Sequence, residues 1–476
     1  MSWPEKVGES QNNREEMEVC DDDGRVRTGT VWTATTHAIT AVIGSGVLAL
    51  PWSVAQMGWI FGPIALVFFA YVTYYTAILL CDCYRTPDPI HGRRNYTYMN
   101  VVRACLGARD VLVCGFAQYA MLWGTMVGYT ITTATSMMQV MRTNCFHSKG
   151  HDAQCSASGN LYMIIFGLVE ILLSQFPNLE KITLISVVAA VMSFTYSLIG
   201  LYLCIVEFAS HHHIRGTLLG VKAGVDTVST STKVWHSFQA LGNIAFAYTY
   251  SMLLIEIQDT LKSPPPENKT MKRATLYGIG ATTLFYVSLG CLGFAAFGNN
   301  APGNVLTGFY EPFWLIDIAN VAVIIHLVGA YQVYAQPTFA KYEAWLSKRW
   351  PDSGFIHTVY TLRLPCFSSV RSFQFTLCRL LVRPAFVVFT TVIAMMFPFF
   401  NAIVGLLGSI AFWPLTVHLP VSMYMAQAKI KRGSHKWLVL QGLSVVSLIV
   451  SLIAAVGSFA DIADRLKHAT LFKTEL

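Results

Sequence analysis

Charged residues are scarce in this sequence. Asp, Glu, Lys and Arg make up 12% of its 476 residues, whereas hydrophobic residues make up 54%. A soluble domain covers itself with charge and usually carries about 25% charged residues. The scarcity therefore excludes an ordinary soluble protein and indicates a chain whose surface mostly faces lipid.

The residue patterns that mark two other classes of membrane protein are also missing. An ion channel needs repeated rings of carbonyl or carboxylate groups along a pore, and a metalloenzyme needs suitably spaced metal ligands. The sequence contains no such rings, and its dense histidine run, 211–213, has no Cys, Asp or Glu spaced to complete a metal site. We therefore expect no enzyme activity, no metal and no cofactor.

The first thirty or so residues contain no apolar run of the signal-peptide type and are acidic in patches. We expect residues 1–31 to form a disordered cytosolic tail. Apolar stretches of about 20 residues, long enough to cross a bilayer, then recur almost to the C-terminus. They predict a single all-α polytopic domain, 32–460, followed by a short extracellular tail, 461–476. The eleven predicted spans are 32–58, 59–83, 111–141, 161–177, 181–207, 235–258, 273–297, 313–338, 380–398, 402–427 and 437–460.

Lys and Arg are distributed unevenly between alternate loops. If the N-terminus is cytosolic, 25 of the 33 Lys and Arg residues lie in inner segments, as the positive-inside tendency of membrane proteins requires. The distribution therefore predicts a cytosolic N-terminus and an extracellular C-terminus. It also accounts for the net charge of +7 without a nucleic-acid partner, because the inner membrane face attracts basic residues.

Of the eleven cysteines, only Cys145 and Cys155 fall in a loop predicted to lie outside the cell. Disulfides persist in oxidising compartments, so we expect these two residues to form one. The other nine lie in spans or on the inner side, where we expect free thiols.

The stretch His37–Trp59 interrupts the first span with Gly44-Ser45-Gly46 and then Pro51. Non-helical backbone at membrane depth is found only where it is buried in protein or lines a cavity. At such a break the outer half-helix offers N–H groups to a carboxylate, and the inner half-helix offers carbonyls to an ammonium group. Alternatively, the glycines only allow another helix to pack closely. This stretch alone does not decide between the two interpretations.

A second interruption is predicted in the sixth span, Trp235–Gln258, at Gly242-Asn243. Interrupted spans at corresponding positions in two halves of a chain are the best sequence sign of a transporter binding site. If spans one to five and six to ten are inverted repeats, the two breaks face each other at the bilayer midplane. The pair therefore favours a binding site, although Asn243 would equally suit a hydrogen-bonded amide in the protein core.

Five segments resemble the plant amino acid permeases of the amino acid/auxin permease family, in the amino acid-polyamine-organocation superfamily. They are GRVRTGTVWTATTHAITAVIGSGVLALPWSVAQMGW, YYTAILLCDCYRTPDP, RNYTYM, GYTITTATSM and ALGNIAFAYTYS. The resemblance extends from about Asp21 to near the C-terminus. It implies a leucine-transporter-type fold: two inverted five-helix repeats plus an eleventh helix, with broken first and sixth helices.

The same resemblance implies a function. It implies a monomeric amino acid permease in the plasma membrane that imports neutral and acidic amino acids together with protons, by alternating access. Two alternatives stay open, a sodium-coupled transporter and an amino acid sensor with little transport. A sensor would use the same pocket, so only substrate flux would separate it from a transporter.

The predicted substrate site combines residues from both breaks with residues of two other spans. Its members are Val42, Gly44, Ser45, Gly46, Val47, Tyr129, Asn243, Ile244, Ala245, Phe246 and His326. We expect the backbone N–H groups that follow Gly44 to bind the substrate carboxylate. Carbonyls near Val42 and from Asn243 to Ala245 would bind the ammonium group, and the aromatic residues and His326 would face the side chain.

Ionisable residues inside the spans are candidates for carrying the coupled proton, because charge at membrane depth is costly and usually functional. His37 lies seven residues before Gly44, about 10 Å toward the cytosol, so it does not readily touch the substrate. His326 lies near the middle of the eighth span, which the resemblance places beside the first. Histidine changes charge nearest to physiological pH, which favours His326, whereas His37 would equally serve as a neutral structural residue.

Two carboxyl groups, Glu256 and Asp317, are further candidates for the proton, although each would also serve as a cap or an ion-pair partner. Glu170 and His418 are expected to be structural.

The coupling ion is predicted from an absence. Sodium-driven members of this fold use hydroxyl side chains of the eighth span, but Phe313–Pro337 contains neither Ser nor Thr. A hard cation needs oxygen ligands, whereas the nitrogen of His326 suits a proton. The sequence therefore favours proton coupling.

Overall fold

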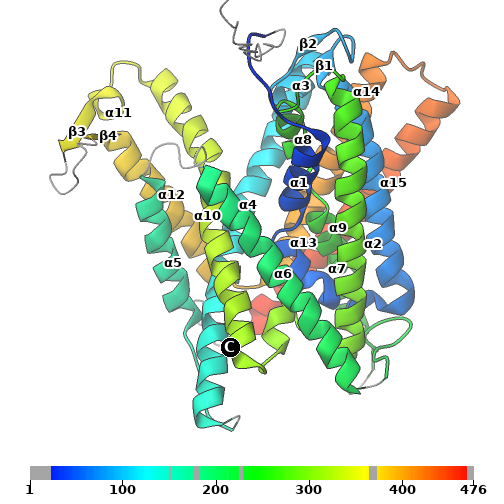
Figure 1. Cartoon of the computed structure of the whole chain (residues 1–476), viewed down its shortest axis with the longest axis vertical. Helices are drawn as coiled ribbons and strands as arrows, with labels where there is room; N and C mark the ends of the chain where they lie inside the picture. The colour runs from blue at the N-terminus through cyan, green and yellow to red at the C-terminus, as the bar shows by residue number, and fades with distance from the viewer. Residues whose placement is uncertain are drawn as a thin grey trace, which may run out of the picture.

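A computed structural model describes residues 23–468 except 151, 176–182, 212, 225–228 and 364–371. This part of the chain is almost entirely helical, and Figure 1 shows long helices running side by side along the molecule. Nine of the described helices are long and apolar enough to cross a membrane. The predicted all-α polytopic architecture is confirmed.

The α-helices are α1 Val31–Val42, α2 Leu50–Cys83, α3 Tyr98–Cys105, α4 Ala108–Lys149, α5 Gly159–Ser174, α6 Thr183–His211, α7 Thr230–Ala247, α8 Ser251–Gln258, α9 Glu267–Phe297, α10 Phe313–Arg349, α11 Gly354–His357, α12 Leu377–Met396, α13 Phe400–Ala411, α14 Leu419–Gln427 and α15 His435–His468. Three short 3₁₀ helices are η1 Ser45–Ala49, η3 Gly298–Asn300 and η4 Val305–Gly308, and η5, Phe412–His418, is a π-helix. Two antiparallel hairpins pair β1 Arg85–Thr86 with β2 Arg93–Arg94 and β3 Val359–Arg363 with β4 Ser372–Thr376.

Each of the eleven predicted spans has a counterpart among these helices. The first two spans are joined in α2, where Gly58 adopts φ 76° and ψ −176° inside an otherwise continuous helix. Glycine tolerates this positive φ, and a side chain would collide with the backbone of Gly220 and Leu218. The predicted boundary between the spans, 58 to 59, therefore coincides with a sharp kink.

The first span is broken where the sequence predicts. α1 begins after Thr30, whose hydroxyl accepts a hydrogen bond from the Thr33 N–H, and it ends at Val42. Gly44 is extended, with φ −127° and ψ −157°, and the 3₁₀ turn η1 follows it. Proline at the second position of α2 then starts the outer half-helix, because its fixed φ suits the first turn of a helix.

The sixth span is also broken, but the predicted position of the break is wrong. α7 continues through Gly242 and Asn243 to Ala247, and the gap before α8 is formed by Tyr248, Thr249 and Tyr250. Gly242 instead allows a close helix contact, since a side chain there would collide with the Gly405 carbonyl of α13. Aromatic and β-branched residues are weak helix formers, which makes the Tyr-Thr-Tyr segment a plausible place for the helix to open.

The half-helices of the two broken spans pack against one another and against α9, α13 and α15. α1 and α2 pack against α9, and α7 packs against α2, α13 and α15. The eighth span, α10, packs against α4 and α6 rather than beside the first span as predicted. The core between these helices is dominated by buried aliphatic and aromatic residues.

Both predicted tails are shorter than expected where the structure describes them. The chain is already packed at Gly29, which pairs with Leu261 just after α8, so the predicted disordered segment, 1–31, extends too far. Residues 1–22 lie outside the described part of the chain. At the other end, α15 continues to His468, past the predicted boundary at 460.

Candidate functional site

The break in the first span presents backbone N–H groups inside the protein. Ser45 and Gly46 open the 3₁₀ turn η1, whose first hydrogen bond joins the Val47 N–H to the Gly44 carbonyl. The first N–H groups of a helix have no partner within it, and the turn η1 is fully buried. These groups are therefore available to an anion, as the sequence predicts for a carboxylate.

Gly46 is held tightly against the second break. A side-chain carbon added to Gly46 would lie 2.9 Å from Cδ1 of Phe246 and 3.3 Å from Cα of Ala247. At Gly44, by contrast, an added carbon would meet nothing within 4 Å. The structure therefore brings Gly46 and Phe246 together, two predicted site residues from spans one and six.

The end of α7 presents its carbonyls later in the chain than predicted. The Ile244 carbonyl accepts from the Tyr248 N–H at 3.2 Å, and the Ala245 carbonyl accepts from the Thr249 hydroxyl at 2.7 Å. Asn243 is completely buried, and its side-chain amide donates to the Ser53 hydroxyl at 3.3 Å. The Ala247 carbonyl, which lies beyond the predicted set, instead accepts from the Tyr286 hydroxyl of α9 at 3.3 Å.

Tyr286 of α9 connects the two breaks. Its hydroxyl lies 2.6 Å from the Val42 carbonyl, which ends α1, and 3.3 Å from the Ala247 carbonyl, which ends α7. The Tyr286 side chain is completely buried and its ring contacts the Tyr248 ring edge-on, at 5.2 Å between centroids. Two carbonyl ends thus converge on one hydroxyl, which is the arrangement that also suits an ammonium group.

Sequence reasoning missed Tyr286, although one signal for it existed. A tyrosine in the middle of a span needs a partner for its hydroxyl, and the free carbonyls at a helix break are suitable acceptors. The sequence alone does not show which of the 21 tyrosines faces a break.

Tyr129 and His326 lie on α4 and α10, which pack against each other. Tyr129 of α4 is 5% exposed and contacts the Tyr334 ring of α10 edge-on. Nδ1 of His326 donates to the Ala189 carbonyl of α6 at 2.8 Å, and the imidazole meets the Tyr196 ring at 5.7 Å between centroids. These contacts direct His326 toward α6.

The other three predicted proton carriers lie in different surroundings. His37 and Glu256 are exposed on the outer faces of α1 and α8. Asp317, near the start of α10, accepts hydrogen bonds from the Thr143 hydroxyl at 2.6 Å and from the Asn144 amide. It therefore ties the start of α10 to the last turns of α4.

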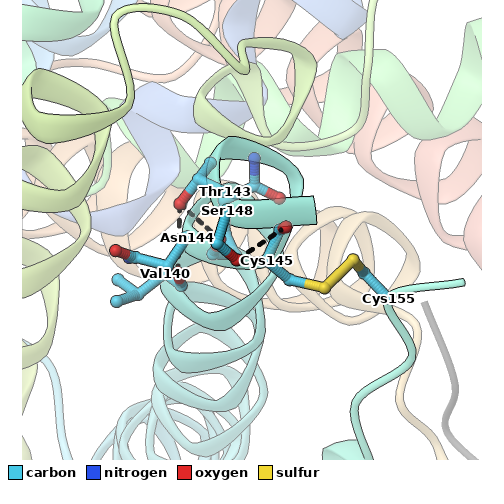
Figure 2. Close-up of a disulfide and its surroundings, with 7 residues drawn as sticks. Val140, Thr143, Asn144, Cys145, Ser148 and Cys155 are labelled. Atoms are coloured by element: carbon cyan, nitrogen blue, oxygen red, sulfur yellow. Dashed lines mark hydrogen bonds between the residues drawn. A yellow bond between two sulfur atoms is a disulfide. The ribbon is translucent and has the colours of Figure 1, made fainter. Parts of the chain in front are cut away.

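The predicted disulfide is confirmed. Cys145 and Cys155 are bonded, with 6.0 Å between their Cα atoms. Figure 2 shows the bond leaving the last turns of α4, close to Thr143 and Asn144. The same end of α4 is thus joined to α5 by the disulfide and to α10 by Asp317.

At the end of the molecule where α1 begins, charged side chains join the segment before α1 to the end of α8. The Arg27 guanidinium contacts Asp23 at 2.7 Å and Asp259, just after α8, at 2.8 Å. Asp259 also accepts a hydrogen bond from the Tyr84 hydroxyl at 2.6 Å. Two backbone hydrogen bonds reinforce this contact, from the Gly29 N–H to the Thr260 carbonyl and from the Lys262 N–H to the Gly29 carbonyl.

Comparison with known proteins places these features in context. Residues 27–463 match the family model described as "Transmembrane amino acid transporter protein". The chain is 55% identical to amino acid permease 8 of Arabidopsis thaliana over 456 residues, covering 95% of both proteins. It is 54% identical to amino acid permease 2 of the same plant, covering 95% of this chain and 92% of that protein.

Two solved transporters share the fold at low sequence identity. MhsT in complex with L-phenylalanine has a TM-score of 0.53 at 11% identity, covering 91% of this chain and all of that one. Mhp1, described as a nucleobase-cation-symport-1 family transporter, has a TM-score of 0.50 at 13% identity, covering 92% of this chain and 94% of that one. The predicted leucine-transporter-type fold, with its broken first and sixth helices, is confirmed.

Proposed function

This chain belongs to the transmembrane amino acid transporter family, and we propose that it is a plasma-membrane symporter that imports neutral and acidic amino acids together with protons. The observation that carries the proposal is the junction of the two breaks. Free N–H groups at Ser45 and Gly46 lie next to two converging carbonyl ends at Val42 and Ala247. An amino acid zwitterion needs both kinds of group at once.

The substrate carboxylate would rest on the N–H groups of Ser45 and Gly46, at the positive end of the outer half-helix. The Val47 N–H, also predicted to bind it, is bonded to the Gly44 carbonyl in this structure. The substrate ammonium group would meet the Val42 carbonyl and the end of α7, where Ala247 extends the set predicted from Asn243 to Ala245. The substrate side chain would face Phe246, and Tyr129 of α4 and His326 of α10 are the other predicted contacts. Since the recognised groups are mostly backbone, the site would accept several amino acids.

Proton coupling is supported by the residues of α10. The stretch Phe313–Pro337 lacks the hydroxyl ligands of a sodium site, and His326, near its middle, is 6% exposed. Of the four predicted proton carriers, His326 is the one whose side chain is buried. A potential of about 100 mV supplies roughly 2.3 kcal/mol per charge and one pH unit roughly 1.4 kcal/mol, enough for an accumulation of a few hundredfold.

Alternating access is supported by the inner contact between Arg27 and Asp259. With this contact made, α1 and α8 are held together and the inner side of the junction is closed. Release of substrate to the cytosol would require the contact to open. We assign this end to the cytosol from the distribution of Lys and Arg, which places the N-terminus inside and the C-terminus outside. The proposed transporter functions as a monomer.

Expression in a cell that lacks its own permeases tests the proposal. Neutral amino acids should enter against their gradient, with an inward current that grows as the external pH falls. A current that requires sodium at constant pH would show sodium coupling instead. Saturable binding without any flux would identify an amino acid sensor.

A further inference from the structure

Glu170 is a buried carboxyl group that the substrate site does not use. It lies on α5, where α5 packs against α4, α10 and α12, and its exposed fraction is 0%. Its Oε2 accepts a hydrogen bond from the Gln332 amide at 2.6 Å, whereas its Oε1 has no partner among the described residues. Burying an ionised carboxylate without a counter-charge is far more costly than burying a neutral acid. The site therefore favours a carboxyl group that holds a proton.

Among the described residues, no hydrogen bond or ion pair joins Glu170 to a basic side chain. Tyr331 of α10 is close, but its hydroxyl is bonded to a threonine of α12 at 2.9 Å. The Arg383 guanidinium of α12 is engaged by the Ser174 carbonyl and by Glu343, both at 2.7 Å. The charged and titratable side chains of α4 are Arg109, Asp110, Cys114, Tyr119, Tyr129, Arg142, His147 and Lys149, besides its disulfide cysteine.

A row of polar side chains leads from Glu170 along α10. The Gln332 side-chain oxygen accepts from the Gln336 amide at 3.2 Å, and both glutamines are buried. Glu343 follows seven residues after Gln336, two helical turns further on the same face. Figure 1 shows that this end of α10 leads toward α11 and the β3–β4 hairpin, at the same end of the molecule as β1 and β2. The row therefore leads to the proposed cytosolic side.

We propose that Glu170 is a proton-binding site from which the coupled proton is released to the cytosol. The carboxylic acid holds the proton while α5 and α10 are packed as in this structure. When the inner side opens, the O–H bond of the acid breaks and water arriving along Gln332 and Gln336 takes the proton. The remaining carboxylate is reprotonated in the next cycle by a proton that enters from the external side. The inference rests on the proposed proton coupling, in which His326 lies six residues before Gln332, about 9 Å further from the cytosolic end.

The test variant is Glu170→Gln, which keeps the shape and the hydrogen-bonding capacity of the side chain but cannot release a proton. Uptake and current are measured across external pH, and exchange is measured with equal unlabelled amino acid on both sides of the membrane. We expect Glu170→Gln to keep exchange within about twofold of wild type while it loses accumulation and most of the pH dependence. Glu170→Asp, which can still titrate, should restore part of both.

Two comparisons keep the test decisive. Glu311→Gln, the same chemical change on an exposed residue of the outer loop, should keep wild-type accumulation. If Glu170→Gln retains the wild-type pH profile, or if exchange and accumulation fall together and Glu170→Asp rescues neither, Glu170 is structural and the inference is wrong. If wild-type uptake itself does not depend on pH, the proposed proton coupling fails instead, which the wild-type curve shows independently of any variant.

Discussion

The Arg27 guanidinium contacts the Asp259 carboxylate at 2.8 Å although 232 residues separate them in the sequence. Arg27 precedes α1 and Asp259 follows α8, so the pair joins the inner halves of both broken spans. Its side chains are 4% and 18% exposed. A pair this well buried is expensive to break, because the remaining charge stays desolvated.

Replacing Arg27 by Ala should open the inner side. Removing one partner of a buried pair costs about 3–5 kcal/mol, enough to favour inward-open states strongly. A cysteine placed near the helix breaks should then react faster with a thiol reagent applied from the cytosol, while apparent affinity for external substrate falls. Arg25→Ala is the matched control, since Arg25 meets the same Asp259 at 3.7 Å with a side chain that is 60% exposed. If both variants had an equal effect, the result would be due to the loss of a positive charge near Asp259 and not to the loss of the specific Arg27 contact.

The ion pair between Arg27 and Asp23, which adjoins the inner contact, should be insensitive to cytosolic pH. The hydrogen bond from Arg27 holds the pKa of Asp23 well below its usual range. A carboxyl group with a lowered pKa stabilises the contact above its ordinary pKa, and the stabilisation is lost only as the pH falls through the lowered value. The labelling rate, divided by that of a fully exposed reference cysteine at the same pH to remove the titration of the thiol itself, is therefore expected to stay constant between about pH 5 and 8. A ratio that climbs steeply as the pH is lowered within that interval would contradict this assignment.

Gly46 and Gly44 should respond differently to the same substitution. Alanine at Gly46 would press on Phe246, and overpacking a buried site costs about 1–3 kcal/mol, whereas alanine at Gly44 has open space. We expect Gly46→Ala to lower uptake at subsaturating substrate roughly 5- to 150-fold, and Gly46→Leu to abolish it with normal surface expression. Gly44→Ala should stay close to wild type. Normal uptake by a well-folded Gly46→Leu variant would remove this break from the mechanism.

Tyr286→Phe should weaken substrate binding without unfolding the protein. Loss of the hydroxyl leaves the Val42 and Ala247 carbonyls without their shared donor, at a cost of about 1–3 kcal/mol. We expect the KM for amino acids to increase roughly 5- to 150-fold with similar surface expression. Tyr277→Phe on the same helix is the control, because Tyr277 stacks on Trp32 at the surface. An unchanged KM in Tyr286→Phe would limit Tyr286 to a packing role.

His326→Gln should still bind substrate but lose much of the pH dependence of uptake. Glutamine can donate to the Ala189 carbonyl as the imidazole does, so the packing against α6 is retained, but it cannot titrate. Binding is measured by substrate protection against heat, and coupling by current against external pH. A wild-type pH profile in this variant would assign His326 to packing.

The sequence predicts local features of this protein better than distant contacts. Gly44, Gly46 and Pro51 locate the first break because their backbone preferences are intrinsic. Gly242 led to the wrong position for the second break, because glycine marks both a helix interruption and a close helix contact. The residues from Tyr248 to Tyr250 that form the second break are compatible with a helix and become non-helical only in their tertiary context.

Contacts between residues of different spans cannot be predicted from local sequence patterns. No local pattern connects Arg27 to Asp259 or Tyr286 to Val42, since each pair depends on how distant helices are arranged. The sequence predicts a structural role for Glu170, and only the packing against α10 reveals that one of its oxygens has no partner among the described residues. The disulfide was predictable because its cysteines are close in sequence and share one loop.

The contact between α7 and α13 restricts how related sequences can vary. A side chain at Gly242 would collide with the Gly405 carbonyl, and one at Gly408 with the Gly242 carbonyl. Alanine, usually counted among the mildest replacements for glycine, brings the same first carbon as any larger residue and is therefore excluded almost as strongly. Related sequences cannot replace these glycines through a series of small changes, because even a substitution by alanine would push the two helix backbones apart. Deep mutational scans should consequently show that positions 242 and 408 tolerate only glycine, within helices that elsewhere accept many apolar residues.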